Sequence, residues 1–367
     1  MNIFVQKDVL IKPLLLANSI IDRKQLFPIL SNIMIHLDEN ILYIVSTDME
    51  IEIKFCINVE GGGKSERITV PARKLLDICR TFDDRSSINI KTYGGKAEIC
   101  SGKSRYILLT LPPNDYPSID TGVSLISFTI KSRLIKELIK RTQFAIAQQD
   151  IRYYLNGMLI HIRNGYIKAV ATDGHRLAVS EFYFDELQDL DFQVIVPRKS
   201  VIEIEKALSL NDSIVKVDLS GGHIKFSDAD VVFTTKLIDG KFPEYQKIIS
   251  QEMSYYAVVC KSKLIQVISR ASILTNDKNK GVRLTFSNNN LVVLASNTEQ
   301  EEAEEQVDIN YTGPTICIGF NYQYLLSALD VISGDNVNFG IKDPQTSVML
   351  FGDNDMVSKY VIMPMRI

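Results

Sequence analysis

The sequence lacks any apolar run of the roughly 18 to 20 residues that a membrane-spanning helix needs. Its first residues also lack the basic stretch followed by a sustained apolar stretch that marks a secretion signal. Five scattered cysteines, Cys56, Cys79, Cys100, Cys260 and Cys317, form no C-x-x-C pair of the kind that holds zinc or does redox work. These absences predict a cytoplasmic protein with reduced thiols, no metal site and no membrane segment.

The sequence also lacks a basic charge balance, since 41 Lys and Arg residues face 44 Asp and Glu residues, for a net charge of −3. Proteins that bind nucleic acid usually carry an excess of positive charge, so the total argues against that class and only the distribution can favour it. Apolar residues make up 46% and charged residues 23%, which excludes a disordered chain. A length of 367 residues predicts two or three domains.

What the sequence does contain is a threefold internal repeat. The entry from a strand into a helix recurs at residues 4–11, 128–135 and 258–265. An apolar strand ending in a small polar pair recurs at Thr47-Asp48, Thr172-Asp173 and Ser296-Asn297, with spacings of 125 and 124 residues. We therefore predict an α+β protein of three similar domains, at residues 1–120, 127–249 and 255–367.

The positive charge is concentrated on the helices that the repeats predict. These span roughly residues 6–20, 71–82, 131–142, 198–208, 261–271 and 320–331, and together they carry a formal charge of +10. The strands and loops must then carry −13. A basic helix face is usually only solvated, but helices brought to one surface would form a positive lining able to contact phosphates without reading sequence.

Two segments look like catalytic motifs but lack the rest of the pattern. The run Gly61-Gly62-Gly63-Lys64-Ser65 resembles a phosphate-binding loop, yet position 58 is Asn rather than Gly and strand-forming residues follow. Asp173 and His175 could suggest hydrolysis, but no nucleophile, metal cluster or second carboxylate lies at a useful spacing. We predict no catalytic residue and no cofactor, and interpret His175 as a structural or pocket-wall residue.

Four segments, at residues 149–157, 171–178, 300–305 and 360–366, resemble signature segments of the bacterial DNA polymerase III β-subunit family, the sliding clamps. The resemblance runs nearly from end to end. It implies three clamp domains per chain, joined head to tail in a homodimeric ring with helices inside and sheets outside. It also implies a non-enzymatic processivity factor that encircles double-stranded DNA.

The resemblance implies DNA contacts inside the ring or at its face. The residues concerned are Arg23, Lys24, Gln149, Tyr153 and Tyr154, with Arg73, Arg80 and Arg198 as weaker candidates. Position 24 is often Arg in the family, and Lys keeps the charge but loses the two-pronged hydrogen bonding of a guanidinium.

The resemblance further implies a pocket for short peptide motifs of the replicative polymerase α subunit, the clamp loader, translesion polymerases and repair proteins. Its residues are Leu155, Thr172, Gly174, His175, Arg176, Leu177, Pro243, Ile248, Val361, Met363, Pro364, Met365 and Arg366. Apolar side chains that include flexible Met can repack around different peptides, although ordinary core packing is the alternative interpretation.

For the dimer, the resemblance implies a contact between the first domain of one chain and the third domain of another. The residues are Lys74, Lys103, Arg105, Tyr106 and Leu108 on one side and Ile273, Leu274, Glu299, Glu301 and Glu305 on the other. An acidic edge strand calls for a basic partner. Two other hypotheses stay open, a nucleic-acid hydrolase that uses Asp173 and His175 and an open scaffold of three domains.

Overall fold

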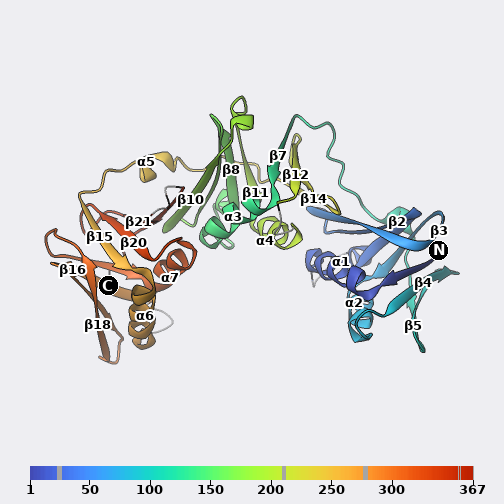
Figure 1. The fold of residues 1–367 in the computed structure, drawn as a ribbon, viewed down its shortest axis with the longest axis horizontal. Helices are drawn as coiled ribbons and strands as arrows, with labels where there is room; N and C mark the ends of the chain where they lie inside the picture. Colours follow the sequence, from blue (N-terminus) through green and yellow to red (C-terminus); the bar gives the residue numbers. More distant parts are fainter. Residues whose placement is uncertain (23–26, 209–211, 276–279, 354, 356, 367) are drawn as a thin grey trace. The chain divides into compact units, whose positions relative to one another are not determined.

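The computed structural model describes residues 1–22, 27–208, 212–275, 280–353, 355 and 357–366 (Figure 1). Its helices are α1 (Lys7–Ile20), α2 (Ala72–Thr81), α3 (Ser132–Thr142), α4 (Arg198–Ala207), α5 (Gln246–Ile249), α6 (Lys261–Ala271) and α7 (Tyr322–Val331). The six helices predicted from the repeats are confirmed to within two residues, and the single turn α5 was not predicted. None of the helices in these ranges is long and apolar enough to cross a membrane.

The chain divides into two compact units, and the division passes through the central repeat. Unit 1 comprises residues 1–136 and 199–237, and unit 2 comprises residues 137–198 and 238–367. The compact units therefore differ from the three sequence repeats, and the strand pairing within each unit explains why.

Unit 1 is built on one antiparallel sheet that contains strands of two repeats. Its strands are β1 (Asn2–Gln6), β2 (Asn32–Thr47), β3 (Ile51–Pro71), β4 (Ser87–Tyr93), β5 (Lys96–Ser101), β6 (Ser104–Leu109), β7 (Ile126–Lys131), β12 (Ile214–Leu219), β13 (His223–Ser227) and β14 (Val231–Lys236). They lie in the order β6-β5-β4-β1-β3-β14-β13-β12-β7, with β2 also on β3. The central repeat thus joins the first where β14 pairs with β3, with Val231 opposite Phe55. The glycine run at 61–63 lies inside β3, and the next helix begins only at Ala72.

Unit 2 repeats this arrangement with strands of the central and third repeats. Its strands are β8 (Gly157–Arg163), β9 (Tyr166–Thr172), β10 (Arg176–Tyr183), β11 (Phe192–Pro197), β15 (Tyr255–Cys260), β16 (Gly281–Ser287), β17 (Asn290–Ser296), β18 (Glu302–Asn310), β19 (Ile316–Asn321), β20 (Asn336–Ile341), β21 (Val348–Gly352) and β22 (Ser358–Ile362). Their order is β11-β8-β9-β10-β22-β21-β20-β15-β18-β17-β16-β19. Here β22 joins β10, with Leu177 opposite Val361. Backbone ladders that cross each repeat boundary thus bind one half of the central repeat to the first repeat and the other half to the third.

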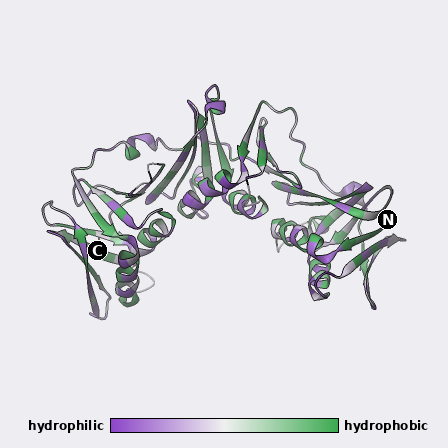
Figure 2. Cartoon of the chain, in the orientation of Figure 1, coloured by the Kyte–Doolittle hydropathy of each residue, from purple (hydrophilic) through white to green (hydrophobic). Residues whose placement is uncertain are grey.

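The helices pack on the sheets through one apolar face. The buried residues of α2 are Ala72, Leu75, Leu76 and Cys79, and those of α6 are Leu264, Val267, Ile268 and Ala271. Both sets follow the i, i+3, i+4, i+7 spacing of an amphipathic helix. The other faces of α2 and α6 are mostly polar, whereas α1 also exposes Val9 and Leu15. Figure 2 shows hydrophilic and hydrophobic residues mixed along each helix. The exposed positions of α2 and α6 include Lys74, Arg80, Lys263 and Arg270.

Candidate functional site

A tight turn between β9 and β10 presents His175 at the surface of unit 2. One carboxylate oxygen of Asp173 accepts hydrogen bonds from the backbone amides of His175 (2.9 Å) and Arg176 (3.0 Å). The hydroxyl of Thr172 donates to the carbonyl of Arg176 at 2.7 Å and accepts from the amide of Gly174 at 3.1 Å. Gly174 has a φ of +88°, a conformation that glycine adopts without strain. The turn is therefore fixed by its own side chains.

The side chain of Arg176 links this turn to two aromatic rings. Its Nε donates to the second oxygen of Asp173 at 3.0 Å, and its Nη2 donates to the carbonyl of Phe144 at 2.6 Å. The guanidinium lies 4.5 Å from the ring centroid of Tyr324 and 5.2 Å from that of Phe144. A cation over an aromatic face is stabilised by the ring quadrupole. The ring of His175 stacks on Tyr324 as well, at 6.5 Å between centroids.

The end of the chain lies against this turn. In the β10–β22 ladder Arg176 stands opposite Ile362, and one residue later the amide of Met363 donates to the carbonyl of His175 at 2.9 Å. The amide of Met365 donates to the carbonyl of Gly319 at 2.8 Å. Met363 and Met365 are thus held by backbone hydrogen bonds to two different repeats.

Of the predicted pocket residues, the structure joins Thr172, Gly174, His175, Arg176, Leu177, Val361 and Met363 through the turn and the β10–β22 ladder. The predicted residues lie at different depths. Leu155, Leu177 and Val361 are buried; Thr172, Arg176, Pro364 and Met365 are half-buried; and Gly174, His175, Pro243, Ile248, Met363 and Arg366 are exposed. Leu177 and Val361 pack in a core cluster with Phe242 and Tyr245. Met363 is 51% exposed and Ile248 is 40% exposed, although both are large and apolar. We name the exposed residues Gly174, His175, Pro243, Ile248, Met363 and Arg366 the C-terminal patch.

The pairing of Asp173 with His175 differs from that of a catalytic dyad. Asp173 binds the backbone amide of His175, and its remaining oxygen is taken by Arg176. The imidazole ring instead stacks on Tyr324. Over the residues that the structure describes, no group of three or more His, Cys, Asp or Glu side chains could hold a metal ion. The turn uses Asp173 to fix the backbone, which accounts for this residue without catalysis.

A second loop, residues 149–154, carries three of the predicted DNA contacts. Arg152 binds both carboxylate oxygens of Asp150, at 3.0 and 2.9 Å, and this guanidinium lowers the pKa of Asp150 to about 2. Tyr153 is 58% exposed and meets the half-buried Tyr154 edge to face, at 5.8 Å between centroids. Gln149 is exposed, and so is Ile151, which the sequence did not single out.

The other residues predicted to contact DNA differ in exposure and in the partners that their side chains already have. Arg73 and Arg80 are exposed on α2, where both interact with Asp77, at 2.9 and 3.7 Å. Arg198 is half-buried and donates to the carbonyl of Ile146 at 3.0 Å. Burial, followed by the nearby charge of Arg176, lowers the pKa of its guanidinium. Arg23 and Lys24 lie outside the described residues.

Most of the residues predicted for the dimer lie at two open sheet edges. Strand β6 ends the unit 1 sheet, where Lys103, Arg105 and Tyr106 are exposed and Leu108 is buried. Lys74 is exposed on α2. On one side, strand β18 pairs with β17 over Glu302–Asp308. On its other side, within the ranges described, β18 pairs with β15 only at Ile309 and Asn310, so the rest of that side has no partner strand there. Its neighbours Ile273, Glu299 and Glu301 are exposed, and Leu274 is half-buried.

The charges at these edges already have partners within their own unit. Arg105 binds Glu98 with its Nε at 2.7 Å. Arg270 on α6 binds both carboxylate oxygens of Glu305, at 2.8 and 2.7 Å. The acidic run was expected to need a basic partner from elsewhere, but Glu305 has one in its own repeat. Glu302 and Glu304 are exposed and form no ion pair with the residues that the structure describes.

Comparison with known proteins agrees across the whole chain. The N-terminal, central and C-terminal domains of the DNA polymerase III beta subunit match residues 1–120, 129–244 and 246–366. The beta sliding clamps of Pseudomonas aeruginosa and Escherichia coli are 40% and 37% identical, each over 100% of both chains. A crystal structure of the Pseudomonas aeruginosa clamp bound to griselimycin is 40% identical over 100% of both chains, with a TM-score of 0.97. The chain therefore belongs to the DNA polymerase III β-subunit family, the bacterial sliding clamps, and is built of three sliding-clamp domains.

Proposed function

We propose that the C-terminal patch is the site at which this sliding clamp captures short peptide segments of its partners. The family is the non-catalytic processivity subunit of DNA polymerase III, so its task is to bind rather than to react. The observation that carries the proposal is the join of β22 to β10, which sets the exposed Met363 beside His175 and its stacked Tyr324. The griselimycin-bound relative supports a ligand site on this fold.

The chemistry of the patch suits apolar peptides of varied sequence. Met363 and Ile248 offer exposed apolar surface, and flexible Met side chains repack around different shapes. Leu177 is buried opposite Val361 of β22, which lies two residues before Met363, and both belong to the core. The expected partners are the replicative polymerase α subunit, the clamp loader, translesion polymerases and repair proteins. A replication subunit works beside the chromosome, so we place the chain in the cytoplasm.

The second part of the proposal is contact with double-stranded DNA that reads no sequence. Exposed basic side chains on the helices include Lys74, Lys140 and Lys263, and none of them forms an ion pair within the described ranges. Arg23, Lys24, Gln149 and Tyr153 would add further contacts. Phosphates attract such groups whatever the base sequence.

The third part concerns the dimer, and the two joins within the chain suggest its geometry. In each join, the first residue of the last strand of one repeat pairs with a residue of the repeat before it. That partner residue lies seven positions after the aspartate, Asp48 or Asp173, that begins the turn of the earlier repeat. Val231 lies opposite Phe55, which follows Asp48 by seven, and Ser358 lies opposite Ser180, which follows Asp173 by seven. One register therefore serves both joins.

The same rule can be applied to the two open edges. The equivalent turn in the third repeat starts at Asn297 and is one residue longer. The amide of Asn297 donates to the carbonyl of Glu301, four residues on, whereas the amide of Asp48 donates to the carbonyl of Ile51, three residues on. Ser104 of one chain would then lie opposite Glu305 of a second copy. It follows that Arg105 would face Glu304, and Ile107 would face Glu302. Two such joins would close a ring of six domains.

Retention on DNA tests the proposal as a whole. On a nicked circular duplex, chain delivered by a clamp loader should stay bound, and cutting the circle should release it, because a ring slides off free ends. Binding should fall steeply with salt and be equal on duplexes of equal length and different sequence. Equal retention on circular and linear DNA would support the open scaffold, and a molar mass of one chain by light scattering would do so independently. Cleavage of the duplex in magnesium would support the hydrolase.

A further inference from the structure

A cavity of about 480 Å³ opens on unit 1 where the first repeat meets the central one. Its floor is the part of β3 at which the strand changes neighbours, since β14 pairs with β3 over Ile51–Phe55 and β1 pairs with it at Glu60. Its walls are the first two turns of α1, the end of α4 and the turn between β13 and β14. The volume is typical of pockets that hold a small ligand.

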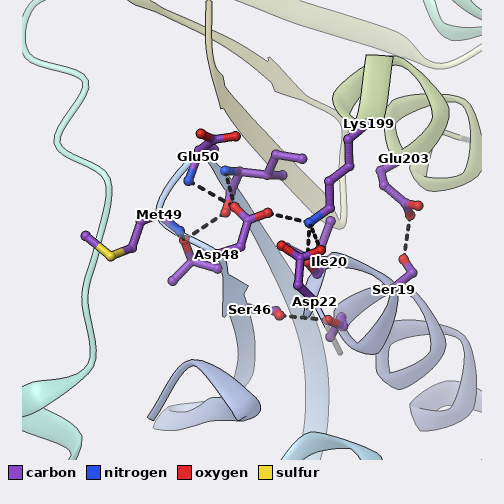
Figure 3. Close-up of polar contacts among 12 residues, drawn as sticks. Ser19, Ile20, Asp22, Ser46, Asp48, Met49, Glu50, Lys199 and Glu203 are labelled. Carbon is purple, nitrogen blue, oxygen red and sulfur yellow. Dashed lines mark hydrogen bonds and ion pairs between the residues drawn. The ribbon is translucent and has the colours of Figure 1, made fainter. Parts of the chain in front are cut away.

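The walls of this cavity are fixed, because the other end of α1 is bound to α4 (Figure 3). The ammonium of Lys199 on α4 donates to the carbonyl of Ile20 and to the carboxylate of Asp22, both at 2.8 Å. The hydroxyl of Ser19 on α1 donates to Glu203 on α4 at 2.5 Å. Since these bonds hold the two helices at one end, the space between them at the other end is a built part of the fold.

In unit 2 the corresponding space is filled by the side chain of Arg141 on α3. Its guanidinium donates to Glu137 and, at 3.0 Å, to the hydroxyl of Ser358. It also lies 3.6 Å from the carboxylate of Asp355 and 5.7 Å from the ring centroid of Phe182. The side chain of Arg141 is 11% exposed and that of Asp355 only 3%, so the buried carboxylate depends on this cation for compensation.

The helices and the joins identify the equivalent positions in unit 1. Arg141 is the tenth residue of α3, and the tenth residue of α1 is Leu16, which is buried. Ser358 is the first residue of β22, and the first residue of β14 is Val231, which lines the cavity. The arginine and the hydroxyl that it binds in unit 2 are therefore both replaced by apolar residues in unit 1.

The ring and the carboxylate near Arg141 have counterparts in the lining of the cavity. Phe182 lies two residues beyond the partner of the first residue of β22, and Ile57 lies two residues beyond the partner of the first residue of β14. Asp355 lies three residues before β22, and Asp228 lies three residues before β14. Ile57 and Asp228 both line the cavity. Unit 1 thus keeps an apolar surface and a carboxylate, with leucine where unit 2 has arginine.

The charge of the lining is negative. Asp228, whose carboxylate accepts the hydroxyl of Ser213 at 3.0 Å, is joined in the lining by Asp8 and Asp230. Lys12 is the cation among the lining residues, so three carboxylates and one ammonium leave a formal charge of −2. Asp8, Lys12 and Asp230 are exposed, which places the charged side of the cavity within reach of another molecule.

We propose that this cavity, which we name the α1 socket, binds a basic side chain, arginine foremost, carried by a partner protein. Val9, Pro13 and Phe55 would cover its aliphatic stem, while the carboxylates would receive its charged head. A guanidinium suits the socket best, because its planar fork can bind two carboxylates at once. The inference is independent of the C-terminal patch, the DNA contact and the dimer register.

Cys56 lines the α1 socket and provides a chemical test. Its thiolate can attack cystamine, which leaves an ammonium arm on the sulfur, or hydroxyethyl disulfide, which leaves a neutral arm of the same length; each exchange releases one thiol. Burial raises the pKa of the Cys56 thiol, so the exchange is run to equilibrium. Relative to the urea-unfolded chain, Cys56 of the folded protein should favour the ammonium arm about tenfold. Peptide mapping by mass spectrometry separates Cys56 from the other cysteines.

Variants and competitors identify the cause of this preference. Asp228→Asn with Asp230→Asn should reduce it to about twofold or less, whereas Asp38→Asn, an exposed position on β2 outside the cavity, should leave it unaltered. Leu16→Arg supplies the arginine that α3 carries and should abolish the preference by filling the socket from within. Millimolar acetylarginine methylamide should compete with the ammonium arm, and its neutral citrulline analogue should not.

Several results would overturn the inference. Equal exchange of the two disulfides at Cys56, or a preference for the neutral arm, would show that the cavity does not select a cation. An equal loss in Asp38→Asn would assign the preference to the overall charge of unit 1. A folded Leu16→Arg variant that keeps the preference would contradict the equivalence with Arg141. If that variant does not fold, the paired aspartate variant and the two arginine analogues still decide the question.

Discussion

Removing residues 363–367 is expected to raise the Kd of the clamp for a partner peptide at least about 100-fold, the scale of a binding hot spot. The ladder of β22 ends at Ile362, so the deletion leaves the sheet of unit 2 intact. It removes the exposed side chain of Met363 and two backbone hydrogen bonds, to the carbonyls of His175 and Gly319. Fluorescence anisotropy with a labelled peptide of a clamp-binding protein measures the loss.

The matched control replaces the same five residues by glycine and serine, which keeps the length but not the side chains. Both variants should keep the molar mass of a dimer in light scattering and the Tm of the parent. Peptide binding that survives both changes would place the site elsewhere on the chain. A variant that unfolds instead would show that the C-terminus serves mainly as core, the alternative that the sequence left open.

Reversing the charge of Arg105 is expected to weaken the dimer about 100-fold, because like charges brought together at an interface cost several kcal/mol. If a second copy joins in the register of the two internal joins, as proposed, Arg105 lies opposite Glu304 and diagonal to Glu302, both exposed. Arg105→Glu would then place a third carboxylate beside those of Glu302 and Glu304. Combining it with Glu304→Arg should bring the dissociation constant back to within about tenfold of the parent value.

Sedimentation on dilution measures these dissociation constants, and Lys91→Glu is the control. Lys91 is exposed on β4, which β5 separates from the β6 edge, so the same charge change there should leave the dimer unaltered. Equal weakening by Lys91→Glu would mean that overall charge, rather than strand register, governs assembly. Failure of the double variant to recover would contradict the predicted register.

The helices could be predicted because their information is local. The apolar spacing of Leu264, Val267 and Ile268 is visible in a few turns of sequence, and the repeats then locate each remaining helix. The single turn α5 is too short to carry such a period. The joins between repeats could not be read in this way, since Phe55 and Val231 are 176 positions apart and no local pattern pairs them.

The site was predicted in part, for similar reasons. The resemblance identified His175 and Met363 but missed Tyr324 and Phe144, whose rings hold Arg176. The signal available was Tyr324, an aromatic residue at the third position of α7, where the other repeats place Lys74 and Ser200. Leu108 was assigned to the interface, yet a period of two along β6 puts it on the same face as Tyr106, which packs on Phe82 at 5.9 Å between centroids. The other residues of β6 are all exposed, so no alternation along the strand predicted that Leu108 is buried.

The join of β14 to β3 also sets a waiting time during synthesis of the chain. Phe55 is synthesised 176 residues before its partner Val231. At the usual rate of translation this interval lasts roughly 9 to 35 seconds. Throughout that interval one side of β3 is an unpaired edge, open to strands of other nascent chains. Glu52 and Lys54 alternate with apolar residues there, and charged side chains make such an edge a poor template for aggregation. A chain that stalls before residue 231 would keep this edge exposed, which would mark it for quality control.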